Sequence, residues 1–173
     1  MKSIDELYEE AGFKYGAALR RLAKGYEADP DQRRDLLQEI HVQLWRSLRL
    51  FDGQCSLQTW VYRVAHNVAA SHIVRMRRAW AQLVELDALE TEPGFVDGEA
   101  RANEQYSVSR LLDRIYRLKP LDRQVILLYL EGEPAASIAE VTGLSAGNVA
   151  TKIHRIKAML NRQLGEGAIH GRK

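Results

Sequence analysis

Side chains able to hydrogen-bond and to carry positive charge recur on one face of a predicted helix near the end of the chain. Asn148, Thr151 and Arg155 follow one another at three- and four-residue steps, and Lys152 lies on their flank. This spacing places side chains on one side of an α-helix. Amide, hydroxyl and cationic groups are those that contact base edges and phosphates in a DNA major groove. We therefore expect this face to bind DNA.

The residues around this face predict a helix-turn-helix. Gly143 can adopt a left-handed conformation and end one helix, and Ser145 can cap the next helix through its hydroxyl. The back of the second helix carries an apolar stripe suited to burial, formed by Val149, Ile153, Ile156 and Leu160. The alternative interpretation is a small helical hairpin with a solvated face.

Composition limits the classes of protein to which the chain can belong. Its 173 residues are 46% hydrophobic and 28% charged, which is typical of a globular protein. No apolar run reaches the ~20 residues of a membrane span, and the first residues have no signal-peptide character. The single cysteine, Cys55, fits a reducing compartment. We expect a cytoplasmic protein without membrane insertion.

Charge and helical pattern divide the chain into two domains and a linker. Residues 1–80 hold 13 Lys/Arg against 10 Asp/Glu, residues 81–104 hold 1 against 7, and residues 105–173 hold 11 against 6. The acidic stretch also loses its helical periodicity and contains Pro and Gly. We predict an all-α protein in which a flexible acidic linker (81–105) joins two small helical domains (1–80 and 106–165). A tail follows at 166–173.

Three helices are expected in the first domain, at about 4–26, 30–51 and 56–78. The second begins at a strong start signal, with Asp29 as N-cap and Pro30 at the first helical position. Opposite its buried stripe, Val42 and Trp45 are apolar where water is expected. An exposed tryptophan beside Arg and Gln is typical of a protein-protein hot spot. The alternative is that Trp45 packs against the first helix.

The third helix presents a cationic and polar face after a polar turn. The outward positions suited to phosphates and bases are Thr59, Arg63, His66, Asn67, Arg75, Arg77 and Arg78. The preceding turn contains Gly53 and can bring its backbone close to a ligand. Trp60 is expected at the edge of the core, and a role for it as a base-stacking wedge is the alternative. Cys55 in this turn is most simply an incidental thiol, with oxidant sensing as the alternative.

Sequence motifs for catalysis are absent. The sequence has no H-E-x-x-H motif, no paired Cys/His ligands, no P-loop and no G-x-G-x-x-G motif. Its five histidines are dispersed along the chain. We expect neither an enzyme nor a metal or cofactor site.

Together these motifs resemble the small, two-domain sigma factors of the extracytoplasmic-function (ECF) type. Residues 35–46 resemble the helix by which that family binds the polymerase clamp. Residues 51–67 resemble its −10 element segment, and residues 118–128 with the helix-turn-helix resemble its −35 domain. Two positions depart from the pattern, since the family usually has a large apolar residue at His41 and often a cation at Ala150.

The resemblance implies an alternative sigma factor that binds core RNA polymerase, directs it to promoter DNA and helps to melt the −10 element. An anti-sigma factor is an expected partner. The implied polymerase-binding residues are Asp35, Gln38, Glu39, Val42, Trp45 and Arg46. The implied −10 residues are Asp52, Gln54, Ser56, Thr59, Arg63, Asn67, Arg75, Arg77 and Arg78. The implied −35 residues are Ser145, Asn148, Thr151, Lys152 and Arg155.

Two other functions fit parts of the same pattern. A sigma-like protein could sequester an anti-sigma factor without binding DNA, although the basic residues at 75–78 argue against this. A plain helix-turn-helix regulator would need a dimerisation element, and the sequence shows none.

Overall fold

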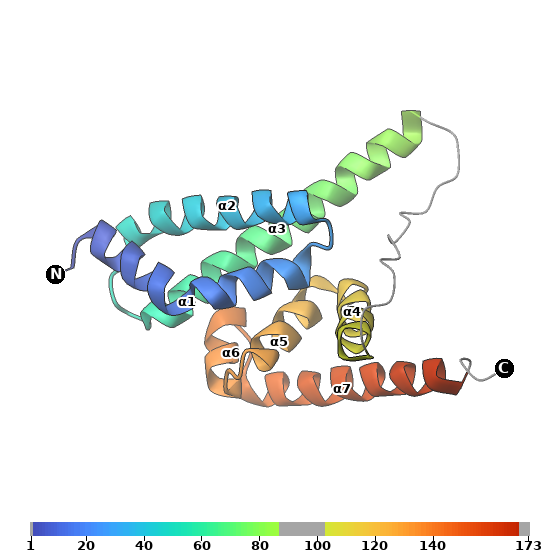
Figure 1. Ribbon diagram of the computed structural model, residues 1–173. Coiled ribbons are helices and arrows are strands. Elements are labelled where there is room, and N and C mark those ends of the chain that lie inside the picture. Colours follow the sequence, from blue (N-terminus) through green and yellow to red (C-terminus); the bar gives the residue numbers. More distant parts are fainter. Residues whose placement is uncertain (1, 87–102, 170–173) are drawn as a thin grey trace.

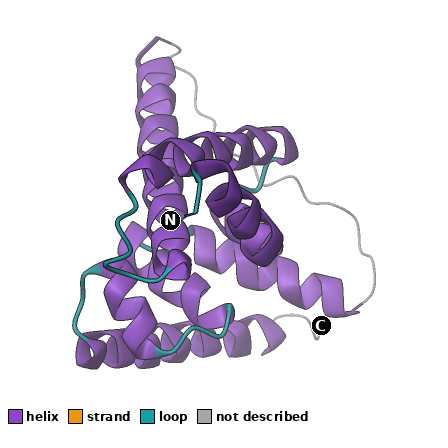
Figure 2. Ribbon diagram, turned by 90° about the vertical axis from the view of Figure 1, so that its left-hand side faces the viewer, coloured by secondary structure: helices purple, strands orange, loops and turns teal. Residues whose placement is uncertain are grey.

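The computed structural model describes the backbone of residues 2–86 and 103–169, and the side chains of residues 2–79 and 108–162. These parts of the chain contain helices and loops and no strand (Figure 2). The helices are α1 (Ile4–Tyr26), α2 (Pro30–Ser47), the short 3-10 helix η1 (Leu48–Leu50), α3 (Leu57–Leu86), α4 (Asn103–Tyr116), α5 (Pro120–Leu130), α6 (Ala135–Thr142) and α7 (Ala146–Ile169). The predicted all-α class is confirmed. None of the described helices is long and apolar enough to span a membrane.

The first domain is a bundle of α1, α2 and α3 (Figure 1). Each of the first two helices starts at a side-chain cap. Ser3 forms a capping box with Glu6, and the Asp29 carboxylate accepts from the amides of Asp31 and Gln32. The apolar stripe of α2 is buried as its spacing predicts, with Leu36, Ile40 and Leu44 at its centre.

The buried face of α3 differs from the expected one. Val61, Tyr62, Ala65 and Ala69 form it together with His66, which is only 2% exposed. The expectation that His66 points outward is therefore wrong. The His66 Nδ1 atom lies 2.9 Å from the hydroxyl oxygen of Tyr26, and this partner makes burial of a polar ring favourable. The spacing of apolar residues along α3 does not identify a buried histidine, because its partner lies on another helix.

The second domain consists of α4 to α7, and its core includes Ile115, Val125, Leu128 and Ile138. Arg123 of α5 is also buried, at 3% exposure. Its guanidinium donates hydrogen bonds to the carbonyl oxygens of Ile115 and Tyr116, at the C-terminal end of α4. This arginine satisfies carbonyls that the helix itself leaves without donors.

Two helices extend beyond their expected ends. Helix α3 continues past Arg78 to Leu86, so the start of the expected linker is helical. Helix α7 continues to Ile169, into the expected tail. The rest of the expected linker up to residue 102, and the end of the tail, lie outside the described residues.

The two domains pack against each other, with α6 lying against α3 and α4 against α1 (Figure 1). Leu127 of α5 also lies close to Gly25 of α1. Arg21 of α1 and Glu131 beside α5 form a two-point ion pair, with nitrogen–oxygen distances of 2.8 and 2.6 Å. In this arrangement the helix-turn-helix lies beside the start of α3.

Candidate nucleic-acid interface

The turn before α3, at residues 51–56, is held in place at both of its ends. The Phe51 ring packs against the Trp60 ring with 5.4 Å between centroids, and Trp60 Nε1–H donates to Ser47 Oγ at 3.1 Å. Trp60 thus lies at the edge of the core, as expected. Gly53 has a φ of +77°, a conformation that other residues rarely adopt. Asp52 and Gln54 remain exposed between these anchors.

Ser56 links the turn to α3. Its hydroxyl accepts from the backbone amide of Thr59 at 3.0 Å and lies 2.9 Å from the Thr59 hydroxyl. Ser56 therefore acts as the N-cap of α3. Because the Ser56 oxygen is engaged in holding the helix start, substituting it would alter the local fold as well as any ligand contact.

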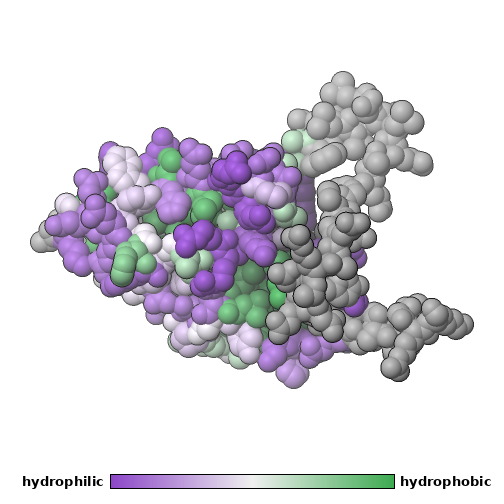
Figure 3. All heavy atoms as spheres, in the orientation of Figure 1, coloured by the Kyte–Doolittle hydropathy of each residue, from purple (hydrophilic) through white to green (hydrophobic). Residues whose placement is uncertain are grey.

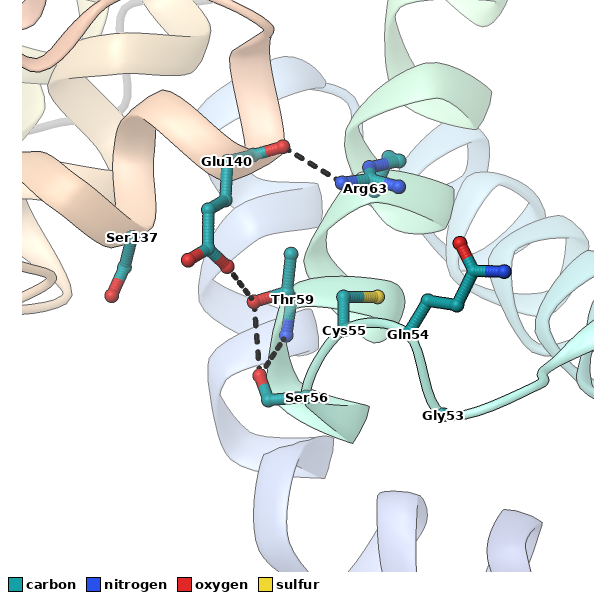
Figure 4. A pocket seen from close by; sticks show the side chains of 8 residues that line it. All are labelled: Gly53, Gln54, Cys55, Ser56, Thr59, Arg63, Ser137 and Glu140. Carbon is teal, nitrogen blue, oxygen red and sulfur yellow. Dashed lines mark hydrogen bonds between the residues drawn. The ribbon is translucent and has the colours of Figure 1, made fainter.

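A pocket of about 710 Å³ opens between this turn and the helix-turn-helix domain. Figure 4 shows that Thr59 and Arg63 of α3 face Glu140 of α6 across it. The Thr59 hydroxyl donates to the Glu140 carboxylate at 3.0 Å, and the Arg63 guanidinium donates to the Glu140 carbonyl oxygen at 2.8 Å. The remaining lining residues are Gly53, Gln54, Cys55, Ser56 and Ser137.

The expected outward residues of α3 divide into two groups. Asn67, Arg77 and Arg78 are exposed, as an interface with DNA requires. Thr59 is only 4% exposed, so the expectation that it lies on an open face is wrong for this arrangement of the domains. The reason is its position between the Ser56 cap and Glu140.

Arg75 is exposed but is paired within the first domain. Its guanidinium donates to both oxygens of the Glu39 carboxylate, at 3.0 and 2.5 Å. This hydrogen bond holds the pKa of Glu39 below its usual value. One residue expected to bind DNA and one expected to bind polymerase therefore bind each other.

The face of α2 opposite the core is exposed over most of its length. Asp35, Gln38, Val42 and Arg46 are all open to solvent. The sequence predicts Trp45 either exposed for binding or packed against the first helix, and Trp45 does both in part. It is 37% exposed, and its Nε1–H donates to an Asp5 oxygen of α1 at 3.3 Å. An apolar ring that is held in place yet accessible suits a binding surface. The face of the molecule in Figure 3 is mainly hydrophilic, with hydrophobic residues in a few small areas.

His41 replaces an apolar residue on this helix without disturbing it. Its Nδ1 atom lies 3.0 Å from the Tyr8 hydroxyl oxygen of α1, and burial lowers the pKa of its imidazole. The ring is therefore part of the contact between α1 and α2.

The recognition helix α7 matches its expected geometry. Gly143 ends α6 with a φ of +75°, and the Ser145 hydroxyl accepts from the backbone amide of Asn148 at 3.2 Å. Val149, Ile156 and Leu160 are buried, whereas Asn148, Thr151 and Arg155 are exposed. The Lys152 ammonium pairs with Asp122 at 2.5 Å, which ties α7 to α5.

Two family models match the chain, one over the first domain and one over the second. Residues 14–79 match the family model of sigma-70 region 2, and residues 109–160 match that of sigma-70 region 4. The chain belongs to the sigma-70 family. The first match covers the turn and most of α3, and the second covers the helix-turn-helix.

Two curated relatives of this sigma factor are named as ECF sigma factors. The ECF RNA polymerase sigma-E factor of Haemophilus influenzae is 28% identical over 138 residues, which are 75% of this chain and 73% of that protein. The ECF RNA polymerase sigma factor SigW of Bacillus subtilis is 25% identical over 159 residues, which are 87% of this chain and 82% of that protein.

Two solved structures share the fold of this sigma factor. The sigma factor RpoE from Bartonella quintana, in complex with the anti-sigma factor NepR, gives a TM-score of 0.69 at 18% identity, over 91% of this chain and 96% of that one. CnrH, in complex with the cytosolic domain of CnrY, gives a TM-score of 0.66 at 20% identity, over 92% of this chain and 88% of that one.

The contact between the two domains of this sigma factor is not evident from the sequence. Its residues are Arg21, Gln58, Glu131, Glu133 and Glu140. Glutamates at the ends of short helices are common and usually solvated, and the partners lie 75 to 110 residues away in the sequence. One available signal was the set of three acidic residues between 131 and 140 within a basic domain.

Proposed function

We propose that this ECF-type sigma factor binds core RNA polymerase, directs it to promoters with defined −10 and −35 elements, and helps to open the −10 element. The observation that supports the proposal is the presence of two separate surfaces with exposed polar and cationic side chains, one on the turn and α3 and one on α7. The domain limits that we propose remain 1–80 and 106–165. Catalysis belongs to the polymerase, and the function assigns the protein to the bacterial cytoplasm.

The polymerase contact is proposed on the exposed face of α2. Its residues are Asp35, Gln38, Glu39, Val42, Trp45 and Arg46. Val42 and Trp45 offer apolar area, and the charged neighbours form a polar rim. This is the composition of a hot spot with its surrounding ring.

The −10 contact is proposed at the turn and along α3. Opening DNA requires that a base leave the stack at a cost of a few kcal/mol and be held in a pocket. The exposed Gln54 side chain can contact a base edge, while Arg77 and Arg78 can neutralise phosphates along a single strand. Asp52, Ser56, Thr59, Arg63, Asn67 and Arg75 complete the proposed site.

The −35 contact is proposed on α7, where Asn148, Thr151 and Arg155 face solvent. Ser145 and Lys152 flank them. Helices of this kind enter the major groove with such residues at base edges.

An anti-sigma factor is a further proposed partner. The proposal is supported by the likeness of the fold to RpoE, which was solved with the anti-sigma factor NepR. A chain that bound only such a factor would be a sequestering protein. Its DNA-facing residues would then be dispensable.

The test mixes the purified chain with core RNA polymerase and a promoter fragment carrying a fluorescent base analogue in the −10 element. We expect a stable complex on gel filtration and a rise in fluorescence as the base leaves the stack. A complex without a fluorescence rise at any promoter would contradict the opening role. Absence of the polymerase complex would contradict the function as a whole.

A further inference from the structure

Arg75 of α3 and Glu39 of α2 form a two-point ion pair on the surface of the first domain. The two terminal nitrogens of the guanidinium each donate to a different oxygen of the carboxylate, at 3.0 and 2.5 Å. An arginine held in this way keeps one orientation, whereas a surface arginine without such a partner samples many rotamers. The pair therefore fixes the direction in which Arg75 faces solvent.

The backbone at both ends of the pair is also fixed. Glu39 precedes Ile40, which is fully buried in the core of the first domain. On α3, His72 lies three residues before Arg75 and is only 6% exposed. The His72 Nε2 atom lies 3.1 Å from a carboxylate oxygen of Glu27, the residue that follows α1. The orientation of the guanidinium is thus determined by contacts among α1, α2 and α3.

The pair presents its cation to a ligand more openly than its anion. The Arg75 side chain is 57% exposed, and the Glu39 side chain is 31% exposed. A guanidinium has five N–H donors, and Glu39 uses one on each terminal nitrogen. Among the donors that Glu39 does not use, the Nε–H and its neighbour form a second parallel pair. Two parallel N–H groups suit two oxygens of a phosphate.

Charge and order act in opposite directions at this pair. The Glu39 carboxylate lowers the positive potential around Arg75 and so weakens the attraction for a polyanion. It also holds the guanidinium in advance, which removes an entropy loss that a free side chain would undergo on binding. The two effects predict opposite signs for the loss of Glu39, so a measurement of affinity separates them.

We propose that Glu39 is a positioning residue for DNA: it holds the Arg75 guanidinium so that the outer edge of that group binds a phosphate of the promoter strand. The inference rests on the proposed function, which places Arg75 in the −10 site, and it gives Glu39 a role apart from the polymerase contact. Arg78, one turn farther along α3, is also exposed and extends the contact to a neighbouring phosphate.

The test measures binding of the full chain, without polymerase, to a fluorescent pool of single-stranded DNA of random sequence. Glu39→Ala should bind about fivefold more weakly than the parent chain, the scale of one surface pair, although it removes a negative charge. Because polymerase is absent, loss of a polymerase contact cannot produce this result. Asp31→Ala is the matched control. It removes the same charge from another α2 carboxylate that pairs with an arginine, Arg34, at 3.3 Å, and should bind no more weakly than the parent.

A merely structural role for Glu39 predicts a different pattern in double variants. In an Arg75→Ala chain, which should itself bind more weakly, adding Glu39→Ala should cause no further loss, because the residue that Glu39 positions is gone. Arg75→Lys keeps the charge but not the fork, so it should bind nearly as weakly as Arg75→Ala. Exchanging the two residues, as Glu39→Arg with Arg75→Glu, should keep the parent's resistance to urea but not its affinity for DNA.

The edge of a guanidinium also fits the two acceptor atoms of a guanine, so the probe is varied. An equal loss on an oligothymidine, which contains no guanine, would assign the contact to phosphate. A loss confined to the random pool would contradict the phosphate contact.

A Glu39→Ala chain that binds as tightly as Asp31→Ala would overturn the positioning role, and so would a further loss in the Arg75→Ala chain. If Arg75→Ala and Arg78→Ala weaken binding while Glu39→Ala does not, the proposed −10 site stands and only the role of Glu39 fails. If neither arginine variant weakens binding, the proposed −10 site is contradicted as well.

Discussion

Individual polar residues of this sigma factor have two possible sets of partners. Glu39 binds Arg75, and Lys152 binds Asp122. Glu39 is also a candidate for binding polymerase, and Arg75 and Lys152 are candidates for binding DNA. The side chains that suit binding to DNA or polymerase also suit binding within the chain. The effect of a substitution at such a residue therefore includes the loss of an internal pair.

His66 should make the stability of the first domain depend on pH. Burial lowers the pKa of its imidazole to about 3, below the value of ~6.5 in an unfolded chain. The unfolded state therefore binds the proton more readily than the folded state does. The contribution of neutral His66 to the free energy of unfolding is complete above pH ~6.5. It is lost as pH falls towards 3, by up to about 1.4 kcal/mol per pH unit.

The measurement is urea unfolding of the wild type and of His66→Gln between pH 7 and pH 4.5. The variant should lose the part of the slope that His66 contributes, while the carboxylates titrate equally in both proteins. Equal slopes in the two proteins would show that His66 is not the group responsible.

Gln54 should help to set the preference for a base in the −10 element. Its side chain is exposed in the turn, and a pocket distinguishes a flipped base by its Watson–Crick edge. The measurement is the transcription rate from a panel of promoters with variant −10 elements. Gln54→Ala should change the order in which the four bases are preferred at one position of the element.

Arg78→Ala is the control for Gln54→Ala. It should weaken all members of the panel about equally, because phosphate contacts carry no sequence information. An unchanged ranking with Gln54→Ala would leave the turn as a simple connector. Ser56→Ala is less informative, since its hydroxyl caps α3.

At the scale of elements, α2 and α7 each bury one face in a core and leave another face exposed. In α2 the exposed face should carry the polymerase contact. Replacing Gln38 and Trp45 with Ala should weaken binding to core polymerase by on the order of 2 kcal/mol or more. The melting temperature should fall only slightly, since the hydrogen bond from Trp45 to Asp5 of α1 lies at the exposed surface.

Fluorescence anisotropy with core polymerase and thermal unfolding measure the two effects. A large fall in melting temperature with full polymerase affinity of the folded protein would make Trp45 a core residue. Arg34→Ala, at an exposed residue near the start of α2, serves as the control and should alter neither quantity.

In α7 the exposed face should carry the −35 contact. Arg155→Ala should weaken duplex binding and reduce its salt dependence by roughly one charge if the guanidinium contacts a phosphate. Lys152→Ala should have a smaller effect, because Asp122 already holds that ammonium. Titrations at several salt concentrations measure both, and an equal slope in Arg155→Ala and wild type would exclude the phosphate contact.

Local signals made the helices predictable, whereas contacts distant in sequence did not. Caps at Asp29 and Ser145 and the turn at Gly143 are specified by neighbouring residues, so their positions follow from the chain. The burial of His66 depends on Tyr26, and that of Thr59 depends on Glu140. Such pairs arise only when helices meet, and no periodicity within one helix contains them.

The candidate site shows the same division. The exposed residues of α2 and α7 follow from helical projection, because each helix has a single apolar stripe. The sequence predicts an end of α3 near residue 78, whereas the helix continues to Leu86. Beyond residue 75 apolar and cationic residues alternate without a clear helical period, so the pattern does not mark where the helix ends.

At the scale of the whole molecule, two DNA-facing domains share one chain and also contact each other. Their closed arrangement leaves the recognition face of α7 open and covers Thr59 of α3.

The central claim is that this chain directs polymerase to specific promoters. The most direct measurement is in vitro transcription by core RNA polymerase on fragmented genomic DNA of the organism that encodes the protein, with every RNA 5′ end mapped by sequencing. We predict that adding the chain creates discrete start sites that share a −35 and a −10 sequence at a fixed spacing, and that the Gln38→Ala, Trp45→Ala protein does not. A pattern of RNA ends identical with and without the chain, under conditions in which it binds the polymerase, would contradict the account.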